Sequence, residues 1–215
     1  MVVKKIELGS LSTNCYILID ESTKKAAIID PADYNDELKD LLDSCDISSI
    51  EYILLTHGHF DHLQGVAKLK EIYKSAEIAI HSLDADCLVD PEKSLSATSP
   101  FATQIQIPVK ADIILNDNDE FKLGNLNIEV LHTPGHTRGS ICFLCEDVIF
   151  SGDTLFCKTV GRTDFEGGSM EDMLKSVLRI GNLPGDYTVY PGHNRETTLE
   201  EERQHNRYMR KIIWS

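Results

Sequence analysis

The sequence lacks the features that mark several classes of protein. Its 215 residues hold 21 Lys and Arg against 35 Asp and Glu, a formal net charge of −14, so we expect neither a nucleic acid nor an anionic membrane surface as a partner. No apolar run approaches the roughly 18 residues of a membrane span, and no apolar signal core follows Met1. Gly and Pro are sparse, at 13 and 7 residues, and 41% of the residues are hydrophobic, which excludes a disordered chain. The composition predicts a globular protein of the cytoplasm.

The six cysteines are scattered and do not indicate a disulfide framework. Cys142 and Cys145 form a C-x-x-C pair inside the apolar run 141–145. On a strand, a spacing of three places the two side chains on opposite faces, so the pair is interpreted as core packing rather than a redox or metal site.

Hydrophobic periodicity predicts two runs of strands, each followed by helix. In the first half we expect strands at 2–8, 15–20, 26–30, 50–55 and 78–81, and helices at 38–45 and 62–73. In the second half we expect strands at 113–115, 120–123, 126–131, 140–144, 148–150 and 188–190, and helices at 170–178 and 197–213. Consecutive strands of this kind favour two sheets packed face to face with helices outside, in one α/β domain over 1–215. The aperiodic segment 91–108 is either a lid or an ordinary connection over the core.

A dense group of potential metal ligands occupies residues 56–62, Thr-His-Gly-His-Phe-Asp-His. His57, His59, Asp61 and His62 follow an apolar strand directly, and Gly58 lets the backbone turn so that the imidazoles can converge. Burying these groups together without a cation would leave several polar atoms unpaired, so the segment predicts a metal site.

Three further ligand-type residues follow later predicted strands. His132 comes after 126–131, Asp153 after 148–150, and His193 after 188–190. Each arrangement is a strand, a tight turn and a ligand-type side chain, so all three can gather at one rim of the sheets. Together with the first group they are sufficient for two metal ions that share one carboxylate.

The chain resembles the metallo-β-lactamase-fold hydrolases and, among them, the short single-domain form of the glyoxalase II group. The resemblance rests on the motifs at 56–62 and on His-Thr-Pro-Gly-His-Thr (132–137), Ser-Gly-Asp-Thr-Leu-Phe (151–156), Gly-Arg-Thr-Asp (161–164) and Tyr-Pro-Gly-His (190–193). It implies a four-layer αββα sandwich.

The resemblance also implies roles for individual residues. The first ion is expected at His57, His59 and His132, the second at Asp61, His62 and His193, with Asp153 bridging the two. His136 is given a structural role in its turn, and Asp30 is expected to support a ligand histidine.

The implied cofactors are two divalent metal ions. Mixed His and Asp ligands suit zinc, and iron or manganese would also be accepted. The implied reaction is hydrolysis of a small anionic thioester, such as a hydroxyacylglutathione, by a hydroxide shared between the ions, with Asp61 orienting that hydroxide. A thiol is a good leaving group and needs no strong general acid. Arg162 is either a substrate-binding residue that contacts a carboxylate or the member of an ion pair within the protein.

The main alternative is a persulfide dioxygenase, which has similar motifs and would bind one iron through His57, His132 and Asp153. A β-lactamase is less favoured because position 153 is not a cysteine, and a nuclease is less favoured because of the charge of −14.

Overall fold

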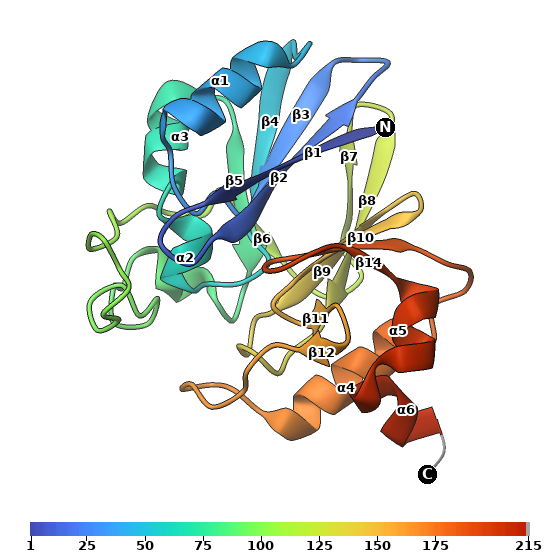
Figure 1. Cartoon of the computed structure of the whole chain (residues 1–215). Coiled ribbons are helices and arrows are strands. Elements are labelled where there is room, and N and C mark those ends of the chain that lie inside the picture. Colours follow the sequence, from blue (N-terminus) through green and yellow to red (C-terminus); the bar gives the residue numbers. More distant parts are fainter. Residues whose placement is uncertain (214–215) are drawn as a thin grey trace.

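Two six-stranded sheets face one another, with helices on both outer faces (Figure 1). The computed structural model describes the backbone of residues 1–213 and the side chains of residues 1–210. No helix in this part of the chain is long and apolar enough to cross a membrane.

The first sheet follows the order of the chain. It consists of β1 (Val2–Leu8), β2 (Thr13–Asp20), β3 (Lys25–Ile29), β4 (Ser49–Leu54), β5 (Glu77–His81) and β6 (Ile113–Leu115). The β1, β2 and β3 strands pair antiparallel, and β3 to β6 pair parallel. Parallel strands require crossover connections. Here the connections contain three helices on the outer face of the sheet: α1 (Asp36–Ser44), α2 (Phe60–Leu63) and α3 (Val66–Ile72).

The helix predicted at 62–73 is divided into α2 and α3. At Gly65 the backbone N–H donates to the carbonyl of Pro31 at 2.8 Å, and a Cβ there would lie 2.5 Å from the carbonyl oxygen of Asp33. The chain therefore passes so close to the end of β3 that only glycine fits, and the helix is interrupted at this point.

The second sheet runs in the order β14-β13-β10-β9-β8-β7. Its members are β7 (Glu120–Leu123), β8 (Leu126–His132), β9 (Ile141–Cys145), β10 (Val148–Gly152), β13 (Thr188–Pro191) and β14 (Thr197–Thr198). Only β10 and β13 pair parallel among these strands, with α4 (Met170–Gly181) in the connection between them.

Several short elements of the described chain were not predicted, including β14 at the start of the helix expected over 197–213. The ribbon of β11 (Leu155–Phe156) and β12 (Thr159–Val160) and the 3₁₀ turn at Ala85–Leu88 were not expected. The helix predicted at 197–213 is divided into α5 (Leu199–His205) and α6 (Arg207–Ile213). Asn206 separates the two, and its side chain donates to the carbonyl of Thr159 at 3.0 Å.

Apolar side chains form three layers, which confirms the predicted αββα sandwich. One layer lies between the sheets and includes Tyr16 and Phe143. A second joins the first sheet to α1–α3, and a third joins the second sheet to α4–α6. Cys142 belongs to the third layer and Cys145 to the layer between the sheets, so the C-x-x-C pair does point to opposite faces of β9.

The loops after β4, β10 and β13 are tied together at one rim of the two sheets. Asn14, in β2, donates through its side chain to the carbonyls of Pro191 and Asn194 at 2.9 and 2.8 Å. The Ile141 N–H, in the second sheet, donates to the carbonyl of Thr56 at 2.9 Å. These bonds hold the ligand-bearing loops of both sheets in register.

Candidate metal centre

Histidine and aspartate side chains converge at this rim in three overlapping groups. The groups are His57, His59 and His136; His57, His62 and Asp153; and Asp61, His62 and His193. Within each group the potential ligand atoms all lie within 4.8 Å of one another. All seven side chains are buried except that of His193, which is partly exposed. Because the groups share His57 and His62, they form one continuous cluster with room for more than one cation.

Several atoms of this cluster have no hydrogen-bond partner among the described residues, although they are buried. They are His57 Nε2, His62 Nε2 and Asp153 Oδ1. Buried polar atoms are normally paired, and leaving three unpaired in one place is costly. The donor set consists of imidazole nitrogen and carboxylate oxygen, which suits divalent transition metals. The residues therefore fit a metal centre.

In two histidines, the contact that Nδ1 makes outside the cluster leaves Nε2 as the nitrogen that faces the cluster. His136 Nδ1 lies 2.7 Å from the carbonyl of Arg162, and His62 Nδ1 lies 3.0 Å from Asp30 Oδ2. A ring that donates through Nδ1 presents an unprotonated Nε2 when it is neutral. Both Nε2 atoms then point inward as lone-pair donors. His59 Nδ1 lies 2.8 Å from His136 Nε2, so two ligand nitrogens already face a common point.

The protonation states of the cluster favour a cation. Burial lowers the pKa of His57 well below its usual range and that of His59 to about 3, so both imidazoles are neutral. Burial alone would raise the pKa of Asp153, but the adjacent His62 outweighs this effect and holds the pKa well below its ordinary value. For His62 the effect of burial is outweighed by Asp153 and Asp30, which raise the pKa. A cation would take the place of the proton that His62 holds among these carboxylates.

Asp30 makes the supporting contact expected of it. Besides contacting His62, its carboxylate accepts from the Thr56 N–H at 2.8 Å and the Thr56 hydroxyl at 2.6 Å. Asp30 has a φ of 51°, a left-handed conformation that Asp and Asn tolerate better than other side chains. The residue thus fixes one ligand ring and the start of the 56–62 loop together.

Asp84 is a structural member of the site that the sequence did not single out. Its buried carboxylate accepts from the Gly58 N–H at 2.9 Å, the Thr137 hydroxyl at 2.6 Å and the Gly139 N–H at 2.9 Å. It therefore connects the 56–62 loop to the 132–139 turn. A Cβ on Gly58 would lie 2.5 Å from Cys87 Cβ, so this glycine is required by close packing as well as by the turn.

The prediction for His132 is wrong, and His136 takes its place in the cluster. His132 is the last residue of β8, and alternation along the strand points it to the same face as Val130, toward the first sheet. There its ring lies against that of His81, and its Nε2 lies 2.9 Å from the carbonyl of Arg138. The turn that follows, with Gly135 at a φ of 147°, is needed before a histidine reaches the cluster. The other six predicted ligands are brought together, from His57 to His193.

Arg162 lies beside the cluster in an ion pair. Its Nε and one terminal nitrogen each donate to the Asp164 carboxylate at 2.7 Å. The guanidinium carbon lies 3.9 Å from the centroid of the Phe165 ring. Of the two interpretations of Arg162, the internal ion pair is the one present in this structure.

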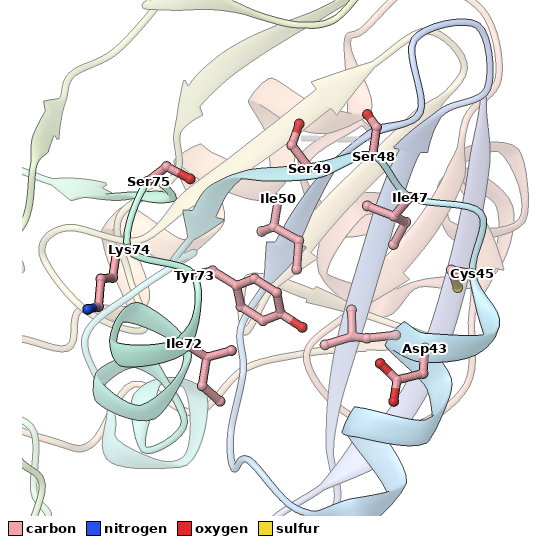
Figure 2. Close-up of a pocket in the computed structure, with 11 residues that line it drawn as sticks. Asp43, Cys45, Ile47, Ser48, Ser49, Ile50, Ile72, Tyr73, Lys74 and Ser75 are labelled. Atoms are coloured by element: carbon pink, nitrogen blue, oxygen red, sulfur yellow. The ribbon is translucent and has the colours of Figure 1, made fainter.

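A cavity of about 670 Å³ opens over the cluster. His59, Asp61, His136, Asp153 and His193 lie at its base. Its walls carry Leu11, Phe60, Phe156, Arg162 and Phe165, and five residues of segment 91–108 complete them, namely Leu95, Thr98, Ser99, Pro100 and Phe101. A second hollow of about 660 Å³ lies at the opposite end of β4, beside Ser49 and Tyr73 (Figure 2). None of its lining residues is a histidine, and it is distant from the metal-ligand loops along the strand.

The sequence profile of the Metallo-beta-lactamase superfamily matches residues 8–193. The chain is 35% identical over 184 residues to the probable polyketide biosynthesis zinc-dependent hydrolase BaeB of Bacillus velezensis, covering 85% of this chain and 73% of that protein. It is 32% identical to the hydroxyacylglutathione hydrolase GloC of Haemophilus influenzae, covering 97% and 98% of the two chains.

Two solved structures are similar over nearly their whole length. The BLEG-1 B3 metallo-beta-lactamase superposes with a TM-score of 0.89 at 34% identity, covering 97% of this chain and 99% of that one. TTHA1623, solved in a di-iron-bound form, superposes with a TM-score of 0.83 at 31% identity, covering 95% and 99%. The names of these relatives include both zinc and iron, so they support divalent metals without indicating which one.

Proposed function

Because the chain belongs to the metallo-beta-lactamase superfamily, whose members are generally metal-dependent hydrolases, we propose that it hydrolyses small thioesters with the aid of two divalent metal ions. The observation that carries the proposal is the buried cluster of imidazoles and carboxylates, with three unpaired ligand atoms, at the base of an open cavity. Zinc, iron and manganese all suit this donor set.

His57, His59 and His136 would hold one ion, and Asp61, His62 and His193 the other. Asp153 lies between these groups: its Oδ1 is 3.3 Å from His62 Nε2, and its Oδ2 is 3.5 Å from His136 Nε2. A carboxylate in this position can contact both ions. When bound, such a pair of ions would supply a nucleophilic hydroxide near neutral pH and polarise the substrate carbonyl.

Asp61 is the residue of the chain best placed to orient the attacking water. Its Oδ2 lies 3.2 Å from His193 Nε2 and 3.4 Å from the Thr13 hydroxyl, and it lies at the cavity base. An ionised carboxylate so held can accept a proton of the water and fix its direction. His193 contributes to keeping the pKa of Asp61 below its ordinary value, after the larger effect of His62 has overcome the opposing effect of burial.

The residues of the cavity wall support a leaving group that needs no proton. Among the described lining residues there is no lysine, tyrosine or cysteine, and Arg162 is paired with Asp164. An amine leaving group requires a proton donor, whereas a thiol of pKa about 8.5 can leave as a thiolate. This difference supports a thioester rather than an amide. The name hydroxyacylglutathione hydrolase, carried by GloC, gives the same class of bond for a relative.

The alternative, a dioxygenase with one iron, requires one occupied site. The ligand atoms of Asp61, His62 and His193 lie within 4.8 Å of one another, as those of the other two groups do, and this supports two ions and the hydrolase.

Metal content and thioester cleavage of the purified protein test the proposal together. We expect two divalent ions per chain by mass spectrometry of the metals, and release of free thiol from S-acyl substrates followed with a thiol-reactive chromophore. Asp153→Ala should lose both the bound metal and the release of thiol. One iron per chain, with oxygen uptake on a glutathione persulfide and no thiol release from thioesters, would overturn it.

A further inference from the structure

Most side chains in the wall of the cavity over the metal-ligand cluster are apolar, with Thr98 and Ser99 as polar exceptions, and its one arginine is ion-paired with Asp164. Building on the proposed function, we infer that the substrate is a thioester with an apolar acyl chain on a thiol arm that carries no carboxylate near the sulfur. An arm built of amides, as in pantetheine, has this chemistry; glutathione, with two carboxylates, does not.

Two aromatic rings lie beside histidines of different ligand groups. The Phe165 ring lies 5.6 Å, centroid to centroid, from the ring of His59, and the Phe156 ring lies 6.1 Å from the ring of His193. Since these histidines belong to different ligand groups, each of those two groups has an aromatic ring beside it that an acyl chain can contact. Such contact favours methylene groups over hydroxyl or charged groups.

The 91–108 segment adds the apolar side chains of Leu95, Pro100 and Phe101, beside the polar Thr98 and Ser99, and hydrogen bonds fix it over the cavity. The Phe60 N–H donates to the carbonyl of Ser94 at 2.8 Å, and the Ser10 hydroxyl donates to that of Phe101 at 2.5 Å. Leu95 and Phe101 thereby line the cavity mouth. The Phe101 side chain is 59% exposed, so a bound acyl chain can cover it.

Charge distinguishes the two kinds of thiol arm. Arg162 is the only lysine or arginine among the described lining residues, and both of its hydrogen bonds at 2.7 Å go to Asp164. Arg162 keeps N–H groups that Asp164 does not use, but its charge is already balanced by Asp164, so a substrate carboxylate gains less from it than from an unpaired arginine. An amide arm does not depend on this interaction.

The test compares three thioesters with the metal-loaded wild type: S-acetyl-N-acetylcysteamine, S-hexanoyl-N-acetylcysteamine and S-hexanoylglutathione. We expect kcat/KM to be at least about tenfold higher for the hexanoyl than for the acetyl cysteamine ester, since each buried methylene contributes about fourfold. The glutathione ester, with the same acyl group, should be cleaved less efficiently than its cysteamine counterpart.

Three variants sharpen the comparison. Phe101→Ser should lower kcat/KM for the hexanoyl ester about fivefold or more. Ile107→Ser is its matched control, because Ile107 lies in the same segment, is 62% exposed and does not line the cavity. Asp164→Asn should free Arg162 and raise the ratio of glutathione-ester to cysteamine-ester cleavage.

Binding of two uncleavable thioethers, S-hexyl-N-acetylcysteamine and S-hexylglutathione, is measured by calorimetry as a readout that does not require turnover. Tighter binding of the first, weakened by Phe101→Ser and not by Ile107→Ser, supports the inference. Preference for the glutathione compounds in both assays, with no effect of chain length, overturns it and leaves the proposed function intact. If none of the thioesters is cleaved, the proposed function is wrong. The relative affinities of the two thioethers then still show whether the cavity prefers the amide arm or glutathione.

Discussion

The imidazoles of His81 and His132 are stacked, with centroids 4.2 Å apart and planes inclined by 9°. His81 ends β5 in the first sheet and His132 ends β8 in the second, so the stack joins the two sheets beside the metal-ligand loops. His81 Nδ1 accepts from the Leu83 N–H at 3.2 Å. Burial, and then the proximity of His132, lower the pKa of His81 to about 4. The hydrogen bond from the Leu83 N–H requires an unprotonated His81 Nδ1.

The stack predicts a loss of stability in mild acid. Asp117 and Asp119 raise the pKa of His81 but do not offset burial, so His81 titrates near 4 when folded and near 6.5 when unfolded. Between these values the unfolded chain binds the extra proton, and stability is lost as the pH falls from about 6.5 to about 4. His81→Phe keeps a flat ring without the titration. We expect the urea midpoint to fall less between pH 7 and pH 5 in this variant than in the wild type, and an equal fall in both would contradict the interpretation.

Replacing His136 and His132 separately tests which histidine belongs to the metal centre. His136→Ala removes a nitrogen that faces His59 at 2.8 Å, so we expect loss of at least one ion and about a 100-fold or greater loss of thioester cleavage. His132→Ala removes a residue stacked outside the cluster and should retain the metal content of the wild type. Metal analysis of both purified variants checks this, and the reverse pattern would restore His132 as the ligand.

Most of the fold and of the cluster could be predicted because their signals are local. Each of His57, Asp153 and His193 follows an apolar strand, and strand ends meet at a rim whatever the details of packing. The choice between His132 and His136 was not local. It depends on strand alternation at the end of β8 and on the path of a turn through Gly135.

Asp84 could not have been recognised from the sequence for a related reason. Its three donors lie 26, 53 and 55 residues away along the chain, and no motif surrounds it. The pairing of Arg162 with Asp164 was an open alternative because arginine suits a substrate carboxylate and an internal one equally. Such assignments require the tertiary structure.

Asp84 is predicted to stabilise the two ligand-bearing loops. In Asp84→Asn the amide nitrogen faces one of the three donors, which loses its acceptor in a buried site. We expect a decrease of about 2 kcal/mol in the free energy of unfolding, measured in urea. Asp86→Asn is the control, because Asp86 is exposed and pairs with the exposed Lys93, and such pairs contribute little. Equal effects of the two substitutions would assign Asp84 no special role.

Asp30 is predicted to raise the metal affinity of the two ligand groups that contain His62. Its carboxylate holds the Nδ1 of that ring at 3.0 Å and also accepts from Thr56, so the ring is oriented with Nε2 toward the cluster. Asparagine tolerates the left-handed conformation at this position, and Asp30→Asn therefore changes the charge and one acceptor rather than the backbone. We expect the affinity of the weaker-binding ion to fall about 10- to 100-fold, as measured by competition with a chromophoric chelator. Asp33→Asn is the control, since Asp33 Oδ1 accepts from the Tyr34 N–H and lies outside all three ligand groups. If Asp30→Asn binds both ions as tightly as the Asp33 control, the orientation of His62 does not depend on this carboxylate, and its contact with Thr56 alone accounts for the residue.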